Sequence, residues 1–232
     1  MKETAILMAA GLGARMRPLT DTLAKPLVPV NGVPLVETVI AALEKRGVAE
    51  IIAVVGYKKE QFIPLAAKFQ KLRLVENPFY ATKNNISSIA AVTSAMRSGP
   101  CFICEADLYI PSPDLFLRLF LRSGFFARFV PGHSDDWLFE IDSERRILSF
   151  HKGGDGKFNL SGISWFTAPD AAKVADIIDA AIRDPANDQC FWDEVVCRHA
   201  SEIDMTIHEV LPGDIVECDT VEDLRALEAR LQ

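Results

Sequence analysis

Apolar residues in the first half of the chain form short continuous runs, and the segments between these runs show helical spacing. Each run has the length and composition of a buried strand. The runs are residues 4–10, 51–55, 72–75 and 100–105. Apolar positions recur every three or four residues over 34–46, and a second helix is expected over 59–69, with Pro64 disturbing it. Strands that alternate with helices in this way predict a parallel sheet with helices on both faces.

The second half combines shorter strands with further helices. Short strands are expected at residues 126–130, 137–141, 147–151, 160–166, 201–210 and 215–218. Helices are expected at residues 85–96, 170–182, 193–199 and 220–231. Thr220 and Asp223 are spaced as a capping box for the last helix. We therefore predict an α/β fold, a Rossmann-like three-layer sandwich with a mostly parallel mixed sheet and a small β/α lobe, in a single domain over residues 1–232.

Composition and charge exclude several classes of partner. The 232 residues are 49 % hydrophobic, enough for a substantial core, and the formal net charge is −7. An acidic chain does not favour nucleic-acid binding. No apolar stretch is long enough to insert into a membrane, and the run at 5–10 is too short for a secretory signal and follows Glu3. We expect a cytoplasmic protein, and the sequence leaves its oligomeric state open.

The cysteines and histidines do not form a metal site in the sequence. Cys101 and Cys104 lie three residues apart on a predicted strand, so they face opposite sides of it and cannot bind one ion. Cys190 and Cys197 are expected on one face of a helix, and with Cys218 they are expected to be small buried apolar residues. The four histidines show no ligand spacing.

The segment from Gly11 to Lys25 carries the clearest chemical signal. It follows a predicted strand at the ligand-binding end of the sheet. The residues from Ala9 to Gly13 lack bulk, so a ligand can approach the backbone closely and its phosphate oxygens can accept from N–H groups. Arg15 adds a planar guanidinium that suits phosphate, and Lys25 adds a point charge.

Two familiar phosphate-binding motifs are excluded in this segment. A dinucleotide fingerprint needs Gly or Ala at position 16, where Met16 stands, and a Walker loop needs a Gly-Lys-Ser/Thr ending that is absent. The string from Leu7 to Leu27, Leu-x-Ala-Ala-Gly-x-Gly-x-Arg-x-x-Pro-Leu-Thr and then Lys-Pro-Leu, resembles the signature of nucleotidyltransferases that make NDP-sugars and CDP-alcohols.

A polar loop at residues 76–88 leads into the helix predicted at 85–96. Asn84, Asn85, Ser87 and Ser88 carry donors and acceptors at the helix start. These side chains either cap the helix or both cap it and contact a nucleotide base. The sugar-directed enzymes usually have a glycine-rich string here, whereas Asn-Asn-Ile-Ser-Ser resembles the choline-phosphate branch.

Two aspartates follow predicted strands far apart in the chain. Asp107 follows the strand at 100–105, and Asp219 follows the strand at 215–218, where it is either a helix cap or a ligand. The resemblance implies that both bind a metal. Two hard oxygen ligands, completed by nucleotide phosphates and water, suit Mg²⁺, so Mg²⁺ is the expected cofactor.

Several weaker features resemble one branch of the superfamily, the bacterial CTP:phosphocholine cytidylyltransferases. These are the Asn84-Asn85 loop, Asp136-Trp137, the Ser161 strand and Phe191-Trp192-Asp193. The resemblance implies transfer of a cytidylyl group from CTP to phosphocholine, or to a similar small amino-alcohol phosphate or phosphonate, with release of pyrophosphate. Relatives tend to have tyrosine where Phe191 stands, so the head group of the acceptor stays open among phosphocholine, phosphoethanolamine and 2-aminoethylphosphonate.

The resemblance also implies roles for individual residues. Arg15, Lys25 and Lys152 are expected to be catalytic, with Lys157 as the alternative to Lys152. The nucleotide is expected to lie on Leu7, Ala9, Ala10, Gly11, Gly13, Asn84, Ser88 and Ala106. The acceptor is expected to lie on Asp136, Trp137, Phe191, Trp192 and Asp193, with the rings holding its cation. The nucleotide-binding residues fall mainly in residues 1–110 and the acceptor-binding residues mainly in 111–232.

Two other functions fit parts of the same pattern. One is a sugar-1-phosphate nucleotidyltransferase that uses UTP, dTTP or GTP and has the same triphosphate-binding half. The other is a regulator that binds a nucleotide without catalysis. The presence of Arg15, Lys25, Asp107 and Asp219 together favours an enzyme over a regulator.

Overall fold

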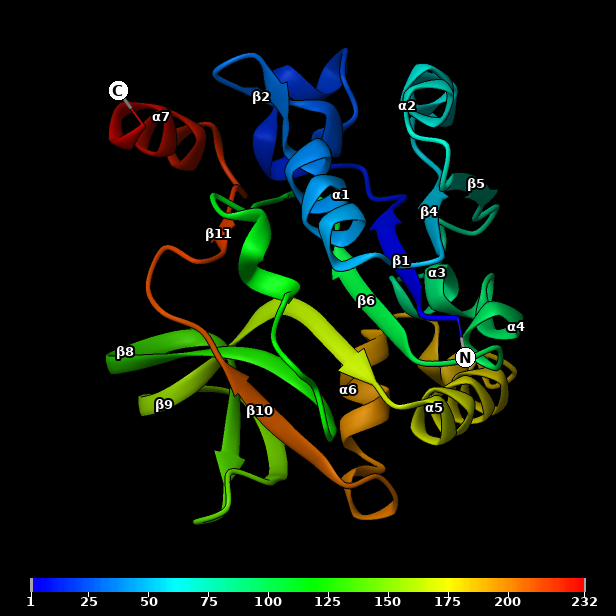
Figure 1. Ribbon diagram of the computed structural model, residues 1–232, viewed down its shortest axis with the longest axis vertical. Coiled ribbons are helices and arrows are strands. Elements are labelled where there is room, and N and C mark those ends of the chain that lie inside the picture. Colours follow the sequence, from blue (N-terminus) through cyan, green and yellow to red (C-terminus); the bar gives the residue numbers. More distant parts are fainter. Residues whose placement is uncertain (1, 232) are drawn as a thin grey trace.

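The computed structural model describes residues 2–231 and contains one seven-stranded mixed sheet with helices on both faces (Figure 1). The strands are ordered β10-β8-β9-β6-β1-β4-β5. Their bounds are Thr4–Ala9 (β1), Glu50–Val55 (β4), Leu72–Glu76 (β5), Cys101–Glu105 (β6), Ser123–Ile141 (β8), Ile147–Phe166 (β9) and Met205–Glu209 (β10). The α-helices are α1 (Leu35–Arg46), α2 (Ile63–Lys68), α3 (Ile86–Ala90), α4 (Thr93–Met96), α5 (Ala168–Ala181), α6 (Trp192–Cys197) and α7 (Val221–Arg230). The predicted fold class is confirmed.

The parallel part of the sheet consists of β1, β4, β5 and β6. Alternate residues on each strand enter two different cores, because successive side chains point to opposite faces. On β1, Leu7 packs into the core beneath α1, while Ile6 packs into the core shared by α3, α4, α5 and α6. Cys104 and Cys101 divide in the same way on β6, so the prediction that they face opposite sides is confirmed.

The rest of the sheet is a long hairpin and one further strand. β9 runs antiparallel to both β6 and β8, and β10 runs parallel to β8. The four short strands predicted between residues 126 and 166 are therefore two long ones, and this prediction is corrected. Polar and glycine-rich stretches at 131–136 and 152–159 indicate loops, yet they pair across the hairpin through several bulges and remain largely exposed.

Smaller differences from the prediction have local causes. Pro64 lies in the first turn of α2, where its missing N–H costs nothing, so it begins this helix after a short 3₁₀ turn. The helix predicted at 85–96 is two helices, α3 and α4, separated where Val92 leaves the helical region. Cys190 precedes α6, so it does not share a helix face with Cys197. The capping box of Thr220 and Asp223 on α7 is confirmed.

Short elements connect these layers and bring the C-terminal segment to the parallel strands. β11 (Val216–Glu217) pairs antiparallel with β7 (Leu108–Tyr109), directly after β6. The remaining short elements are β2 (Pro29–Val30), β3 (Val33–Pro34) and 3₁₀ turns at Ala14–Met16, Leu19–Asp21, Lys25–Leu27, Lys59–Phe62, Pro113–Phe116, Pro185–Asn187 and Ala200–Glu202. The pairing of β11 with β7 places the segment before α7 beside the end of β6 (Figure 1).

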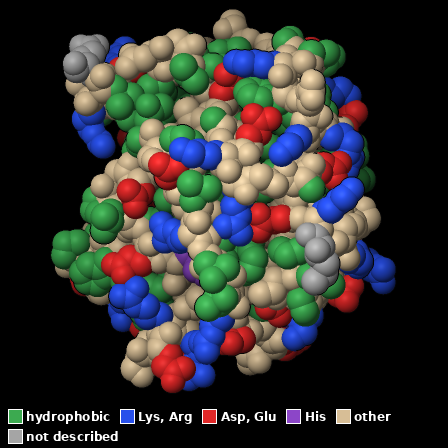
Figure 2. Space-filling model, viewed as in Figure 1, with side chains coloured by type: hydrophobic (Ala, Val, Ile, Leu, Met, Phe, Trp, Pro, Cys, Tyr) green, Lys and Arg blue, Asp and Glu red, His purple; other side chains and the backbone are tan. Residues whose placement is uncertain are grey.

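The charged side chains of both signs are mixed on the face of the molecule that Figure 2 shows, with Lys and Arg interspersed among Asp and Glu. Within residues 2–231, no helix has the length and apolar character needed to cross a membrane.

Candidate active site

The loop after β1 is shaped by Gly13 and opened by Gly11. Gly13 has a φ of 63°, and a Cβ there would lie 2.9 Å from Cβ of Lys25 and 3.0 Å from Cγ2 of Thr20, so only glycine fits. The hydroxyl of Thr20 donates to the Gly13 carbonyl at 2.8 Å. A Cβ at Gly11 would meet no atom within 4 Å, so this part of the loop faces open space. The loop is therefore rigid at Gly13 and accessible to a ligand at Gly11.

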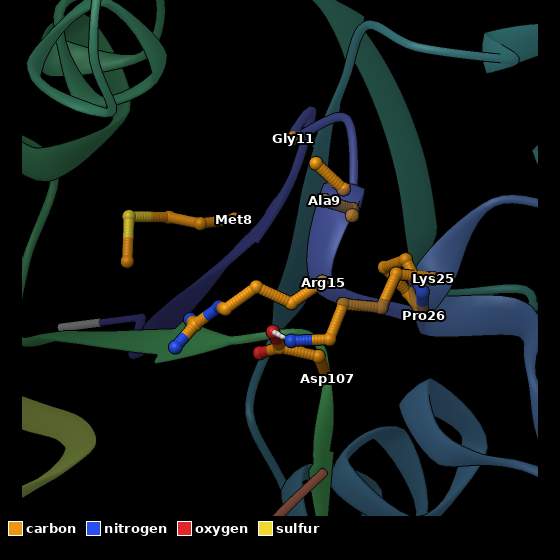
Figure 3. Close-up of a pocket in the computed structure, with 9 residues that line it drawn as sticks. Met8, Ala9, Gly11, Arg15, Lys25, Pro26 and Asp107 are labelled. Atoms are coloured by element: carbon orange, nitrogen blue, oxygen red, sulfur yellow. Dashed lines mark hydrogen bonds and ion pairs between the residues drawn. The ribbon is translucent and has the colours of Figure 1, made fainter. Parts of the chain in front are cut away.

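Lys25 lies almost fully buried at the base of this loop, between the two predicted metal ligands. Its Nζ is 2.5 Å from Oδ2 of Asp107 and 2.6 Å from Oδ1 of Asp219. Figure 3 shows the side chains of Arg15 and Lys25 extending in the same direction, with Lys25 reaching Asp107. The pairing of β7 with β11 explains how two aspartates 112 positions apart in sequence meet at one ammonium group.

Arg15 completes the charge cluster from the solvent side. Its guanidinium contacts both oxygens of Asp219, each at 2.8 Å, and its side chain is 70 % exposed. Arg17, by contrast, pairs with Asp21 at 3.3 Å and does not line the cavity around the glycine loop. Of these two arginines, Arg15 is the one that borders the site.

The charges of this cluster stabilise one another. Burial acts to lower the pKa of the Lys25 ammonium, but attraction to Asp107 and hydrogen bonds to both aspartates outweigh it, so the pKa is raised. Burial acts to raise the pKa of Asp219, but Lys25 and Arg15 lower it further than burial raises it. Lys25 and Asp219 are therefore charged near neutral pH, as electrostatic binding of phosphates requires.

Asp107 and Asp219 fit a magnesium ion by their chemistry. Both present carboxylate oxygens toward one point, which the ammonium of Lys25 approaches as a cation. Within residues 2–231 no set of three or more His, Cys, Asp or Glu side chains is arranged to hold a metal by itself. A two-carboxylate site suits Mg²⁺, because Mg²⁺ retains waters and takes further ligands from substrate phosphates.

Two adjoining cavities open around the glycine loop, and they contain most of the predicted nucleotide-binding residues. One is lined by Met8, Ala9, Gly11, Gly13, Ala14, Arg15, Lys25, Pro26 and Asp107. The other is lined by Met8, Ala10, Gly11, Arg15, Asn85, Ser88, Glu105, Asp107 and Glu217. Met8 and Glu105 were not predicted, whereas Asn85 belongs to the loop for which contact with a base was left open. Met8 lies two residues after Ile6 on β1, so its side chain is on the same face of the sheet and close to the loop. This spacing is the signal in the sequence that could have identified Met8 as a cavity residue.

The side chains of three predicted nucleotide-binding residues lie outside these cavities, and a role for these residues in nucleotide binding stays a prediction. The side chains of Leu7 and Ala106 are fully buried in the core and do not line either cavity. Asn84 holds the neighbouring segment, because its Nδ2 donates to the Gln189 carbonyl at 3.1 Å. Its neighbour Asn85 lines the cavity in its place.

Asn85 and Ser88 do not cap the helix that follows. Asn85 stands at the N-cap of α3 without a side-chain capping bond, and its Oδ1 accepts from the Trp192 backbone N–H at 2.9 Å. The Ser88 hydroxyl accepts from Nδ2 of Asn77 at 3.0 Å. Both side chains are therefore held by groups outside the helix end. Among residues 2–231 no hydrogen bond engages the Nδ2 group of Asn85, so this group can donate to a ligand.

A third cavity adjoins the first two and contains most of the predicted acceptor-binding residues. It is lined by Arg15, Glu105, Asp135, Asp136, Trp137, Lys152, Leu160, Gly162, Phe191, Asp193, Glu217 and Asp219. Trp137 stacks on Phe150 with ring centroids 4.5 Å apart and meets Phe191 edge-on at 6.3 Å. Nζ of Lys152 lies 5.2 Å from the Trp137 centroid. The aromatic wall therefore already holds one cation, as cation–π geometry allows.

Packing places two further predicted residues. Trp192 is only 4 % exposed and packs against Phe125 and Phe166, so its ring is part of the core, and its role in acceptor binding stays a prediction. Lys157 donates to Oε2 of Glu140 at 2.7 Å and does not line the cavity, which leaves Lys152 as the lysine of this site.

Asp193 is buried against this cavity at a cost to stability. It is 4 % exposed, and burial raises the pKa of its carboxyl to about 6. Because this pKa lies above the unfolded value of 3.8, the group weakens the fold as pH rises from about 4 to about 6, and the full penalty is present above that range. Its burial at this cavity therefore destabilises the fold at neutral pH.

We expect Asp193→Asn to stabilise the fold at neutral pH. The amide keeps an oxygen for the Glu194 N–H, which now donates to Asp193 Oδ1 at 2.9 Å, and it removes the buried charge. The gain is on the order of 1–3 kcal/mol at pH 7.5 and disappears below about pH 4. Thermal denaturation of both proteins between pH 4 and 8 measures it; a difference in Tm that does not shrink toward low pH would contradict the assignment.

Comparisons with known proteins agree with this geometry. Residues 5–153 match the family described as the MobA-like NTP transferase domain. The chain belongs to this family. It is 46 % identical over 227 residues to a 2-aminoethylphosphonate cytidylyltransferase of Lancefieldella rimae, covering 98 % of this chain and 92 % of the relative. It is 34 % identical over 228 residues to a choline-phosphate cytidylyltransferase of Streptococcus pneumoniae, covering 98 % of each.

A solved structure gives the same result. A structure of the CTP:phosphocholine cytidylyltransferase from Streptococcus pneumoniae matches the whole chain with a TM-score of 0.91 and 33 % identity. The prediction of a nucleotidyltransferase of the cytidylyltransferase type is confirmed, and the non-catalytic regulator is not supported. Relatives that act on mannose 1-phosphate match only about half of the chain, so the sugar-phosphate alternative has less support.

Proposed function

We propose that this enzyme transfers a cytidylyl group from CTP to a small acceptor that has a phosphate or phosphonate at one end and a cationic amine at the other. One observation carries the proposal: the cavity with aromatic and acidic walls shares Arg15 with the cavity of the glycine loop. A single arginine thus borders both the expected triphosphate and the expected acceptor. The names of the two most similar relatives described above, one for a phosphonate and one for choline phosphate, support this class of acceptor.

The reaction needs positioning and charge neutralisation from the protein. The acceptor's phosphate or phosphonate oxygen attacks the α-phosphorus of CTP in line, a P–O bond forms, and the bond to the leaving pyrophosphate breaks. Both reactants are anionic, so Arg15, Lys25 and the backbone N–H groups near Gly11 reduce their repulsion. No general base is assigned, because the acceptor oxygen is already ionised near neutral pH.

We assign the magnesium site to Asp107 and Asp219. The ion would supply further positive charge at the phosphates when bound. In the described structure, the Lys25 ammonium lies between the two carboxylates. We propose that Lys25 turns from them toward the triphosphate when nucleotide is present, which keeps its charge paired.

The acceptor class is tested by a substrate panel. Initial rates of pyrophosphate release are measured with CTP, UTP, dTTP and GTP against 2-aminoethylphosphonate, phosphocholine, phosphoethanolamine and glucose 1-phosphate. We expect CTP with an amine-bearing acceptor to give the highest kcat/KM. A clear preference for glucose 1-phosphate would contradict the proposal.

We expect Trp137→Ala to weaken acceptor binding selectively. A cation–π contact is worth roughly 0.5–2 kcal/mol, so KM for the acceptor rises between about 2-fold and 30-fold. The KM for CTP stays near its wild-type value, because Trp137 lines only the acceptor cavity. Steady-state kinetics with each substrate varied in turn measures both constants, and an equal rise in the two would show that the ring does not belong to the acceptor site.

Two expectations from the sequence keep the status of predictions. One is the division into a nucleotide-binding half at 1–110 and an acceptor-binding half at 111–232. The other is a location in the cytoplasm, where CTP is made and used.

A further inference from the structure

Glu105 is an ionisable group at the centre of the site that the mechanism does not use. It is the last residue of β6, two positions before Asp107. Its side chain lines both the cavity that contains Asn85 and Ser88 and the cavity that contains Trp137 and Phe191. Glu105 therefore stands at the boundary between the expected positions of nucleotide and acceptor.

The carboxylate of Glu105 has no protein partner. Among residues 2–231, no hydrogen bond or ion pair reaches it, and its nearest charged neighbours include the acids Asp107, Asp193 and Glu217. The nearby cation Lys25 is already engaged by Asp107 and Asp219. Glu105 is partly exposed at the cavity wall. Crowding it among other acids without a donor is unfavourable, so the arrangement points to a ligand that brings positive charge and N–H groups.

A glycine on the neighbouring strand leaves space for the Glu105 side chain. Gly162 on β9 has a φ of 70°, and a Cβ there would lie 2.7 Å from Oε2 of Glu105 and 3.2 Å from Cδ1 of Leu108. Any larger residue would therefore push the carboxylate away from its present position. The absence of a side chain at position 162 keeps Glu105 directed along the cavity wall.

We propose that Glu105 determines specificity for acceptors whose ammonium group carries N–H donors, so that the enzyme prefers a primary amine such as that of 2-aminoethylphosphonate over a trimethylammonium group. This inference rests on the proposed function and deepens it. The rings of Trp137 and Phe191 can hold either kind of cation, because cation–π attraction needs no N–H. A primary ammonium also has three N–H groups that need acceptors, whereas a trimethylammonium has none.

The unpartnered carboxylate provides the discrimination. A primary ammonium donates to Glu105 and offsets the repulsion from the neighbouring acids. A trimethylammonium group covers the carboxylate, excludes water and leaves it without a hydrogen bond. Sites built to hydrogen-bond a substrate N–H reject analogues that lack it much more strongly than apolar pockets reject an extra methyl group.

The test compares two acceptors that differ only at nitrogen: 2-aminoethylphosphonate and its N,N,N-trimethyl derivative. Their kcat/KM values are measured with saturating CTP for the wild type and for Glu105→Gln. The expected result is that the wild type prefers the primary amine and that Glu105→Gln reduces this preference by a factor on the order of 10 to 100, the loss of one charged hydrogen bond. We expect the loss to arise in KM for the primary amine, with KM for CTP unchanged.

Two further variants separate recognition from general damage. Asp155 lies on β9, and its side chain is exposed and outside the cavity. Asp155→Asn removes this carboxylate and should leave the preference unchanged. Glu105→Asp keeps the charge but shortens the side chain, and it should retain part of the preference; it also serves if the glutamine variant fails to fold.

The outcomes distinguish the two levels of the proposal. If the wild type releases pyrophosphate with neither acceptor, the proposed function is wrong. Suppose instead that the wild type uses both acceptors, and that Glu105→Gln keeps the same preference or loses activity equally on both. In that case Glu105 does not recognise the ammonium group, and this inference is wrong.

Discussion

Replacing either Asp107 or Asp219 by alanine is expected to abolish nucleotidyl transfer. Each carboxylate contacts Lys25 and is assigned to the metal site, so its loss removes an ion-binding oxygen and disturbs the cation that faces the triphosphate. We expect turnover to fall by a factor on the order of 10³ or more, since metal and electrostatic contacts at a phosphoryl group supply several kcal/mol. Pyrophosphate release with CTP, Mg²⁺ and acceptor measures the loss.

The control for this prediction lies in the segment from Gly11 to Lys25. Asp21 is exposed and pairs only with Arg17, so Asp21→Asn should keep near wild-type activity. Circular dichroism checks that the alanine variants remain folded, and EDTA should stop the wild type. Activity within a few-fold of the wild type in Asp107→Ala or Asp219→Ala would show that the metal site is wrongly assigned.

Removal of the two cations that face the cavity is expected to have the second largest effect. Arg15→Ala and Lys25→Ala should each lower kcat/KM by about 10²-fold or more, the usual cost of one lost electrostatic contact in a transition state. Arg17→Ala should lose much less, because Arg17 pairs with Asp21 and does not line the cavity. Equal losses at all three positions would show that the loop is oriented differently.

The Lys25→Ala and Arg15→Ala variants are expected to differ in thermal stability. Lys25 has a side chain only 8 % exposed and separates two carboxylates, so Lys25→Ala should also lower Tm, since it leaves these charges unpaired. Arg15 is 70 % exposed and should be replaced with little change in Tm. Thermal denaturation of the two variants measures the difference.

The parallel part of the fold was predictable because its pattern is simple. Strands such as β1 and β6 are buried on both faces, so they appear in the sequence as continuous apolar runs. The β8–β9 hairpin was less predictable. Its central part is exposed and polar, and it is held by backbone pairing and bulges, which leave no hydrophobic alternation in the sequence.

The site was predictable where a residue's role follows from its position in a motif. The glycine loop, Arg15, Lys25 and the two aspartates fall together as expected. The burial of Trp192 in the core was not predictable, because an aromatic residue next to an acid looks the same in sequence whether its ring faces the core or a cavity. Asn84 and Asn85 are adjacent amides, and only the three-dimensional structure shows that the first binds a neighbouring loop and the second lines the cavity.

Glu105 was missed for a related reason. In the sequence it is one polar residue at the end of an apolar strand, which commonly marks the surface end of that strand. Its significance depends on the absence of a side chain at Gly162, 57 positions later, and on the acids that converge from β11 and α6. Long-range packing of this kind is not visible in local spacing.

The central claim is that a cytidylyl group is joined to the phosphorus end of an amine-bearing acceptor, and the product itself tests it most directly. The enzyme is incubated with CTP, Mg²⁺ and 2-aminoethylphosphonate, and the mixture is followed by ³¹P NMR. The account predicts a new pair of mutually coupled signals, one phosphonate and one phosphate, appearing together with pyrophosphate. Two results would contradict it. One is release of pyrophosphate without such a pair of signals. The other is coupled signals that form with glucose 1-phosphate but with neither 2-aminoethylphosphonate nor phosphocholine.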